Sequence, residues 1–110
     1  MNSLASGRCI PCEVGTLPFT ETEIGTLLAE LDPLWEIQEG KLVRKFSFRD
    51  FKGAMEFVNK VAEIATKEWH HPDIYIFFNK VEIKLYTHSI KGLSENDFIL
   101  AAKIDLLPLC

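Results

Sequence analysis

Three histidines lie close together in the second half of this 110-residue chain, at His70, His71 and His88. The first two precede Pro72, and the third follows Thr87. An unperturbed imidazole has a pKa of about 6.5, so histidine can give or take a proton near neutral pH. Because every histidine of the chain flanks one predicted hairpin, the pattern predicts a proton-transfer site. The alternative is that these are surface or half-buried side chains that only bond to nearby backbone.

The three cysteines, Cys9, Cys12 and Cys110, are an odd number and cannot form a closed set of disulfide bonds. The first two have the Cys-x-x-Cys spacing of a zinc knuckle or a redox pair. No second such pair is present, and no predicted strand precedes this one as in a thioredoxin-like unit. A zinc site shared with His70 and His71 is conceivable, but two free thiols on an extended arm are favoured. We therefore expect no metal.

The composition is that of one ordinary folded domain, with 47% hydrophobic residues and a net charge of −4. Domains commonly span about 100–150 residues, so we expect a flexible N-terminal arm over residues 1–18 and a single domain over residues 19–110. The negative charge argues against a nucleic-acid partner, which needs a basic patch. No apolar run approaches the ~20 residues of a membrane span, and no signal-peptide stretch is visible. We expect a cytoplasmic protein with no membrane partner.

Capping signals and hydrophobic spacing predict the element order helix, strand, strand, helix, strand, strand, helix. The first helix should begin at the capping box Thr20-Glu21-Thr22-Glu23 and end before Pro33. The expected fold is α+β, a four-stranded antiparallel sheet with three helices packed on one face. The remaining expected elements are strands over 34–38 and 42–48, a helix capped by Asp50, strands over 73–78 and 81–88 joined at Asn79-Lys80, and a helix opened by Ser94.

Two surfaces follow from this arrangement. The middle helix should bury a stripe at helical spacing, made of Phe51, Ala54, Met55, Val58, Val61, Ala62 and Ala65. The sheet face that the helices leave open should be partly apolar and invite self-association. Tyr75, Phe77 and Phe78 are candidates to line this open face.

Separated motifs of the chain together resemble one known family, pterin-4a-carbinolamine dehydratase. The likeness runs from about Thr20 to Asp105. Its most specific part is the histidine pair with its proline, followed by a strand pair that ends in Thr-His. The matching residues are Phe46-Ser47-Phe48-Arg49-Asp50-Phe51, Ala54, Phe57, Val61-Ala62, Ala65, His70-His71-Pro72-Asp73, Tyr75 through Asn79-Lys80-Val81, Leu85, Thr87-His88, Gly92-Leu93-Ser94-Glu95, Asp97 and Ala101-Ala102.

The resemblance implies a small α+β domain that forms a homodimer through its sheet, sometimes a homotetramer. It implies the removal of water from 4a-hydroxytetrahydropterin, which aromatic amino acid hydroxylases release, to give a quinonoid dihydropterin. Such an enzyme recycles the pterin cofactor of those hydroxylases and uses no metal or organic cofactor itself. Other readings remain: a non-catalytic dimerisation or coactivator-type module, since animal relatives partner a homeodomain transcription factor, or a pterin-handling role linked to molybdopterin metabolism.

Carried over by motif, the catalytic residues are His70, His71 and His88. One of His70 and His88 would protonate the departing hydroxyl, the other would assist at the ring nitrogen, and His71 would orient the substrate. The expected substrate-binding residues are Trp69, Pro72, Thr87, Ser89 and Asp97.

Three of these expectations compete with simpler structural roles or depart from the family pattern. Asp97 has an alternative role, because three positions after Ser94 it can complete a helix capping box. Trp69, Tyr75 and Tyr86 could stack on a flat pterin or simply pack on the sheet. The chain departs from the family pattern at Trp69, where a small or polar residue is common, and at Thr66, where an acidic residue is common.

Overall fold

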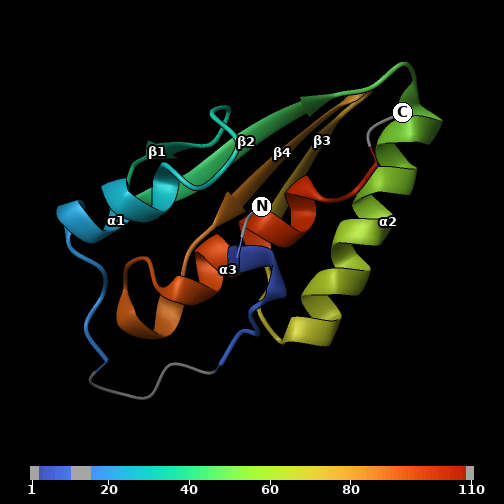
Figure 1. The fold of residues 1–110 in the computed structure, drawn as a ribbon. Helices are drawn as coiled ribbons and strands as arrows, with labels where there is room; N and C mark the ends of the chain where they lie inside the picture. The colour runs from blue at the N-terminus through green and yellow to red at the C-terminus, as the bar shows by residue number, and fades with distance from the viewer. Residues whose placement is uncertain (1–2, 11–15, 109–110) are drawn as a thin grey trace.

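The computed structural model describes residues 3–10 and 16–108 of the chain (Figure 1). It confirms the α+β fold and the expected order of helices and strands. Along the chain the elements are the 3-10 turn η1 (Ser3–Ser6), α1 (Glu21–Leu28), β1 (Glu36–Gln38), β2 (Lys41–Ser47), α2 (Phe51–Glu68), β3 (Asp73–Phe77), β4 (Lys80–Leu85), the 3-10 turn η2 (His88–Ile90) and α3 (Glu95–Asp105).

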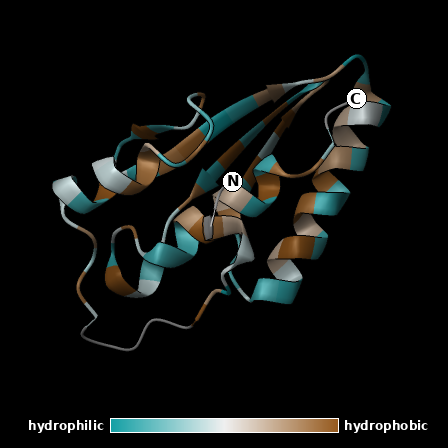
Figure 2. Ribbon diagram, viewed as in Figure 1, coloured by the Kyte–Doolittle hydropathy of each residue, from teal (hydrophilic) through white to brown (hydrophobic). Residues whose placement is uncertain are grey.

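The four strands form one antiparallel sheet in the order β1-β2-β4-β3. The helices lie on one side of this sheet, and α2 packs against both α3 and β4 (Figure 1). The register sets Leu42 opposite Leu85 and Phe46 opposite Val81, so large apolar side chains share the face that the helices cover. Apolar and polar bands alternate along β2, β4 and α2, as this arrangement requires (Figure 2).

The helix starts follow the capping chemistry expected from the sequence. Thr20 accepts the Glu23 amide at 3.3 Å, and the Glu23 carboxylate accepts the Thr20 amide at 2.9 Å, which completes the capping box of α1. Asp50 caps α2 by accepting the Gly53 amide at 2.8 Å. Both helices therefore begin where their caps predict.

The buried stripe of α2 differs from the one expected. Its buried residues are Ala54, Phe57, Val61 and Ala65, while Phe51 is 50% exposed and Ala62 is exposed. Phe51 directly follows the capping residue, so it lies at the end of the helix and outside the stripe that faces the sheet. The observed spacing of three, four and four residues keeps one continuous apolar face over the helix length.

The β3–β4 hairpin is buried on one strand only. Val81, Ile83 and Leu85 on β4 are buried as expected, but β3 is an edge strand and Ile76 is 39% exposed. The turn lies at Phe78 and Asn79, one residue earlier than expected, and the Asn79 side-chain amide donates to the Phe48 carbonyl at 3.0 Å. On this edge strand and its turn, Tyr75, Phe77 and Phe78 are 40%, 59% and 71% exposed.

Residues 3–10 lie against α3, and Leu4 belongs to the buried apolar core. The boundary between an arm and a domain at residue 18 stays a prediction. Within the described part of the chain, no helix is both long and apolar enough to cross a membrane. The cytoplasmic location also stays a prediction.

Candidate active site

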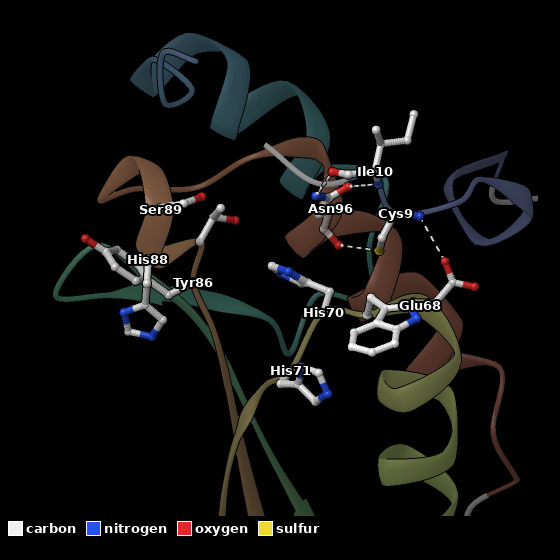
Figure 3. Close-up of a pocket in the computed structure, with 11 residues that line it drawn as sticks. Cys9, Ile10, Glu68, His70, His71, Tyr86, His88, Ser89 and Asn96 are labelled. Carbon is white, nitrogen blue, oxygen red and sulfur yellow. Dashed lines mark hydrogen bonds between the residues drawn. The ribbon is translucent and has the colours of Figure 1, made fainter. Parts of the chain in front are cut away.

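A cavity of about 410 Å³ lies where the C-terminal end of α2, the segment after β4 and the start of α3 meet (Figure 3). It brings together all three histidines and three of the expected substrate-binding residues, Trp69, Thr87 and Ser89. Pro72 and Asp97 do not line it. The complete lining is Cys9, Ile10, Glu68, Trp69, His70, His71, Tyr86, Thr87, His88, Ser89 and Asn96.

The end of α2 places the first two histidines. Trp69 adopts a left-handed conformation, with φ 54° and ψ 34°, and so ends the helix. The His70 amide still donates to the Ala65 carbonyl at 3.3 Å, after which Pro72 favours an extended path into β3. Trp69 is 83% exposed, so its indole is available to a ligand. Pro72 therefore favours the extended backbone that leads into β3, and it does not line the cavity.

His70 is held by a fully buried carboxylate. Its Nε2 atom lies 2.6 Å from Oδ1 of Asp97, which has no exposed surface. The other carboxylate oxygen accepts the Thr87 hydroxyl at 2.7 Å and the Ser94 amide at 3.0 Å. Asp97 thus caps α3, as its alternative role predicted, and also holds a histidine of the cavity; its expected contact with the substrate stays a prediction.

The Asp97 contacts fix how the His70 ring can act. A carboxylate oxygen only accepts hydrogen bonds, so Nε2 of His70 carries the donating N–H. The Nδ1 atom has no hydrogen-bond partner among residues 3–10 and 16–108. When the ring is neutral, Nδ1 is an acceptor, and when it is protonated, Nδ1 is a donor. His70 can therefore take or give a proton at a single nitrogen that is free for a ligand.

His88 stands at the start of η2, three residues beyond the end of β4. Its ring packs edge-on against Tyr86, with ring centroids 5.0 Å apart and an interplanar angle of 74°. The loop is closed by the Thr87 amide, which donates to the Gly92 carbonyl at 3.0 Å. Gly92 leaves no room for a side chain, because a Cβ there would lie 2.5 Å from Pro18. In Figure 3, His70 lies between the Tyr86–His88 pair and a group from the N-terminal segment.

That N-terminal group is what sequence reasoning missed. Cys9 and Ile10 line the cavity together with Asn96, the second residue of α3. Burial, helped by the Glu68 and Asp97 carboxylates, raises the pKa of the Cys9 thiol to about 12. The Cys-x-x-Cys spacing marks Cys9 only as a thiol or a possible zinc ligand. No sequence signal places Cys9 and Ile10 against α3, because their contacts with it span 86 or 87 positions of the chain.

Two further expectations have a mixed outcome. Of the three aromatic residues considered for stacking, Trp69 and Tyr86 line the cavity, whereas Tyr75 lies on β3 beneath the Lys84 amino group. Cys9 is a free thiol, and no cluster of potential metal ligands occurs in the described ranges. Cys12 and Cys110 lie outside the described residues.

Comparison with known proteins decides the family. A family model described as pterin 4 alpha carbinolamine dehydratase matches residues 17–107. The chain belongs to this family. A relative from Rickettsia bellii with that provisional name is 49% identical over 106 residues, covering 96% of this chain and 94% of the relative. A second, from Alkaliphilus metalliredigens, is 45% identical and covers 96% of each chain. The resemblance seen in the sequence is confirmed.

Solved structures agree with the family assignment. A Brucella melitensis protein described as a transcriptional coactivator/pterin dehydratase superposes with a TM-score of 0.76 at 34% identity, covering 80% of this chain and 95% of that one. A pterin dehydratase-like protein described as a RuBisCO assembly factor of the α-carboxysome gives a TM-score of 0.56 at 23% identity, covering 64% and 84%. The second likeness shows a shared fold only.

Proposed function

We propose that this family member dehydrates 4a-hydroxytetrahydropterin to quinonoid dihydropterin and so recycles the pterin released by aromatic amino acid hydroxylases. The observation that carries the proposal is the convergence of three histidines on one cavity, with His70 anchored to buried Asp97. Membership of the pterin carbinolamine dehydratase family supports the choice of substrate.

The reaction needs an acid and a base at neutral pH. The C4a–O bond breaks and its electron pair leaves with the hydroxyl oxygen, which takes a proton and departs as water. The neighbouring ring nitrogen loses its proton, and its electrons form the C4a=N double bond. No electrons are exchanged with another reagent. One positioned group for each proton typically contributes ~10²–10⁴-fold to the rate, and imidazole can serve as either.

The geometry supports different roles for the three histidines. His70 offers only Nδ1 to the cavity, because Asp97 occupies Nε2. His88 is placed across the cavity, against Tyr86. We assign the two proton transfers to His70 and His88 and the orientation of the substrate to His71. Trp69 and Tyr86 supply aromatic surface for the flat ring, in a cavity within the ~300–1,000 Å³ common for small-molecule sites.

The test is the dehydration rate of a synthetic 4a-carbinolamine, followed by absorbance, with His70→Ala, His71→Ala and His88→Ala. We expect kcat to fall by ~10²-fold or more for His70→Ala and His88→Ala, with a smaller loss for His71→Ala. Glu95→Gln is the control, since Glu95 is exposed at the start of α3 and does not line the cavity. An inactive wild-type protein, or full turnover in all three histidine variants, would refute the proposal.

We also infer that the chain self-associates through β3. This edge strand has unpaired backbone groups on one side, and the exposed rings of Tyr75, Phe77 and Phe78 lie on it and its turn. Sedimentation velocity should show a dimer or tetramer that Phe77→Asp dissociates. A wild-type monomer at assay concentration would contradict this inference.

A further inference from the structure

The N-terminal strap, defined as residues 4–10, lies outside the part of the chain that the family model matches, which begins at residue 17. Two of its residues, Cys9 and Ile10, nevertheless line the same cavity as the three histidines. We propose that the strap is a wall of the active site and that Ile10 is a specificity-determining contact for the substrate. The inference rests on the proposed dehydratase function and adds a residue to its site.

The base of the strap is fixed to the body of the domain. Leu4 is buried in the core, and the Lys103 amino group donates to the Ala5 carbonyl at 2.9 Å. Gly7 approaches α3 so closely that a Cβ there would lie 3.2 Å from the Ile99 side chain. This part of the strap therefore has a defined place on α3 before it reaches the cavity.

The tip of the strap is tied to both helices that build the site. From α2, the Glu68 carboxylate accepts the Cys9 amide at 2.9 Å. From α3, the Asn96 side chain accepts the Ile10 amide at 2.9 Å and donates to the Ile10 carbonyl. The Cys9 thiol donates to the Asn96 carbonyl at 3.5 Å. These contacts hold the tip in register with His70, two residues beyond Glu68, and with Asp97, next to Asn96.

The side chain of Ile10 is the part of the strap left open. Both backbone polar groups of Ile10 are bonded to Asn96, yet the residue is 71% exposed beside the cavity. The Ile10 side chain points away from the three histidines (Figure 3), so it is placed to contact the part of a ligand that extends beyond the ring held by them. Because its backbone is already fixed, this contact has little entropic cost. Cys9 remains a neutral thiol because its pKa is about 12, so it adds apolar surface and no nucleophile.

The strap does not hold the proton-transfer groups themselves. Asp97, the partner of His70, takes its own hydrogen bonds from Thr87 and Ser94 and none from the strap. Weakening the wall should therefore reduce affinity for the substrate while the chemical step keeps its rate. The expected signature is a rise in KM at constant kcat.

The matched experiment compares Ile10→Ala with Leu106→Ala in the carbinolamine assay. Both side chains are 71% exposed, but Leu106 does not line the histidine cavity. Losing the apolar contact of Ile10 should raise KM by ~10-fold with kcat within ~2-fold of wild type. Leu106→Ala should leave both parameters unchanged. Equal kinetics for the two variants and wild type would overturn the inference and leave the dehydratase function standing.

A binding measurement keeps the inference independent of turnover. With Cys9, Cys12 and Cys110 changed to Ser, the Ile10→Cys variant carries a single exposed thiol, and Leu106→Cys provides its control. Saturating 7,8-dihydrobiopterin should slow alkylation at position 10 by ~10-fold or more and leave position 106 unaffected. If the wild-type protein does not turn over the carbinolamine, the proposed dehydratase function fails. The effect of the pterin on alkylation at position 10 then decides by itself whether the strap forms a wall of the ligand site. Equal alkylation rates with and without the pterin would refute the strap as a substrate wall.

Discussion

The two ends of α3 each carry a carboxylate that is fully or mostly enclosed, and the two serve different purposes. At the N-terminal end, Asp97 is fully buried and contacts His70. At the C-terminal end, the side chain of Asp105 is 15% exposed and contacts Arg44 at 2.7 Å. Both carboxylates accept several hydrogen bonds and link elements far apart in sequence. Their partners differ, because histidine can change its charge near neutral pH and arginine cannot.

The surroundings of the two pairs explain the difference. Nε2 of His70 is bonded to Asp97, and the ring lines the cavity. A proton can therefore pass between Nδ1 of His70 and a ligand. Arg44 is enclosed, with its guanidinium 4.4 Å from the Phe46 ring and 3.5 Å from Asp32. The Trp35 indole donates to both Asp105 oxygens, at 2.8 and 2.9 Å. The Arg44–Asp105 pair therefore only links elements of the fold, and we call it the C-terminal clamp. The His70–Asp97 pair also links elements of the fold, but its histidine lines the cavity as well.

The largest expected contrast is in catalysis. We expect Asp97→Asn to lower kcat by ~10²-fold, because a side-chain amide cannot accept from His70, Thr87 and Ser94 together as the carboxylate does. Asp105→Asn makes the same chemical change at the other end of α3 and should leave kcat within ~2-fold of wild type. The measurement is kcat for both variants after circular dichroism has shown that each is folded. A similar loss in both variants would remove the distinction.

The next contrast is in stability. Arg44→Met should lower the free energy of unfolding by about 3 kcal/mol, because it leaves the mostly enclosed Asp105 carboxylate beside Asp32 without its cation. Urea unfolding measures the loss. The double variant Arg44→Met with Asp105→Leu should recover part of it, since no unpaired carboxylate then remains at position 105. If Arg44→Met alone costs less than ~0.5 kcal/mol, the pair behaves like a surface ion pair and not a clamp.

Sequence reasoning reached the local features and stopped at contacts between distant residues. The caps at Thr20 and Asp50 were predictable because capping acts within one helical turn. The capping role of Asp97 was predictable for the same reason. Its contact with His70 spans 27 positions and depends on how α2 and α3 pack. Family resemblance selected both residues for the site, but it did not say that they touch.

Arg44 and the N-terminal strap show the same limit more sharply. Arg44 is a buried charged residue between the apolar residues Leu42 and Phe46 on one face of β2, and its partner there is Asp105, 61 positions later. Cys9 and Ile10 precede the family match, and their place depends on Glu68 and Asn96. The edge position of β3 was also hidden, since a strand pattern does not give the strand order. These features arise from tertiary packing and leave no periodic signal in the chain.

The smallest expected effect is the pH dependence of the C-terminal clamp. Burial raises the pKa of Asp105 above its ordinary value of 3.8, although the Trp35 indole and the Arg44 charge act in the opposite direction. Between 3.8 and the higher folded-state pKa, the folded protein binds more protons than the unfolded chain, so this group's contribution to stability falls as pH rises. The stability contributed by Asp105 is fully present below the pKa that it has in the unfolded chain, and it is lost as the pH rises through its pKa in the folded protein.

Asp105→Asn isolates this contribution, because the asparagine does not titrate and all other acidic groups, including nearby Asp32, are common to both proteins. The free energy of unfolding of wild type minus that of the variant should decrease from pH 3.8 upward and then become constant. Urea unfolding over a pH series measures this difference. A difference that grows with pH would mean that Arg44 outweighs burial at Asp105. The C-terminal clamp would then be an ion pair stabilised mainly by the charge of Arg44.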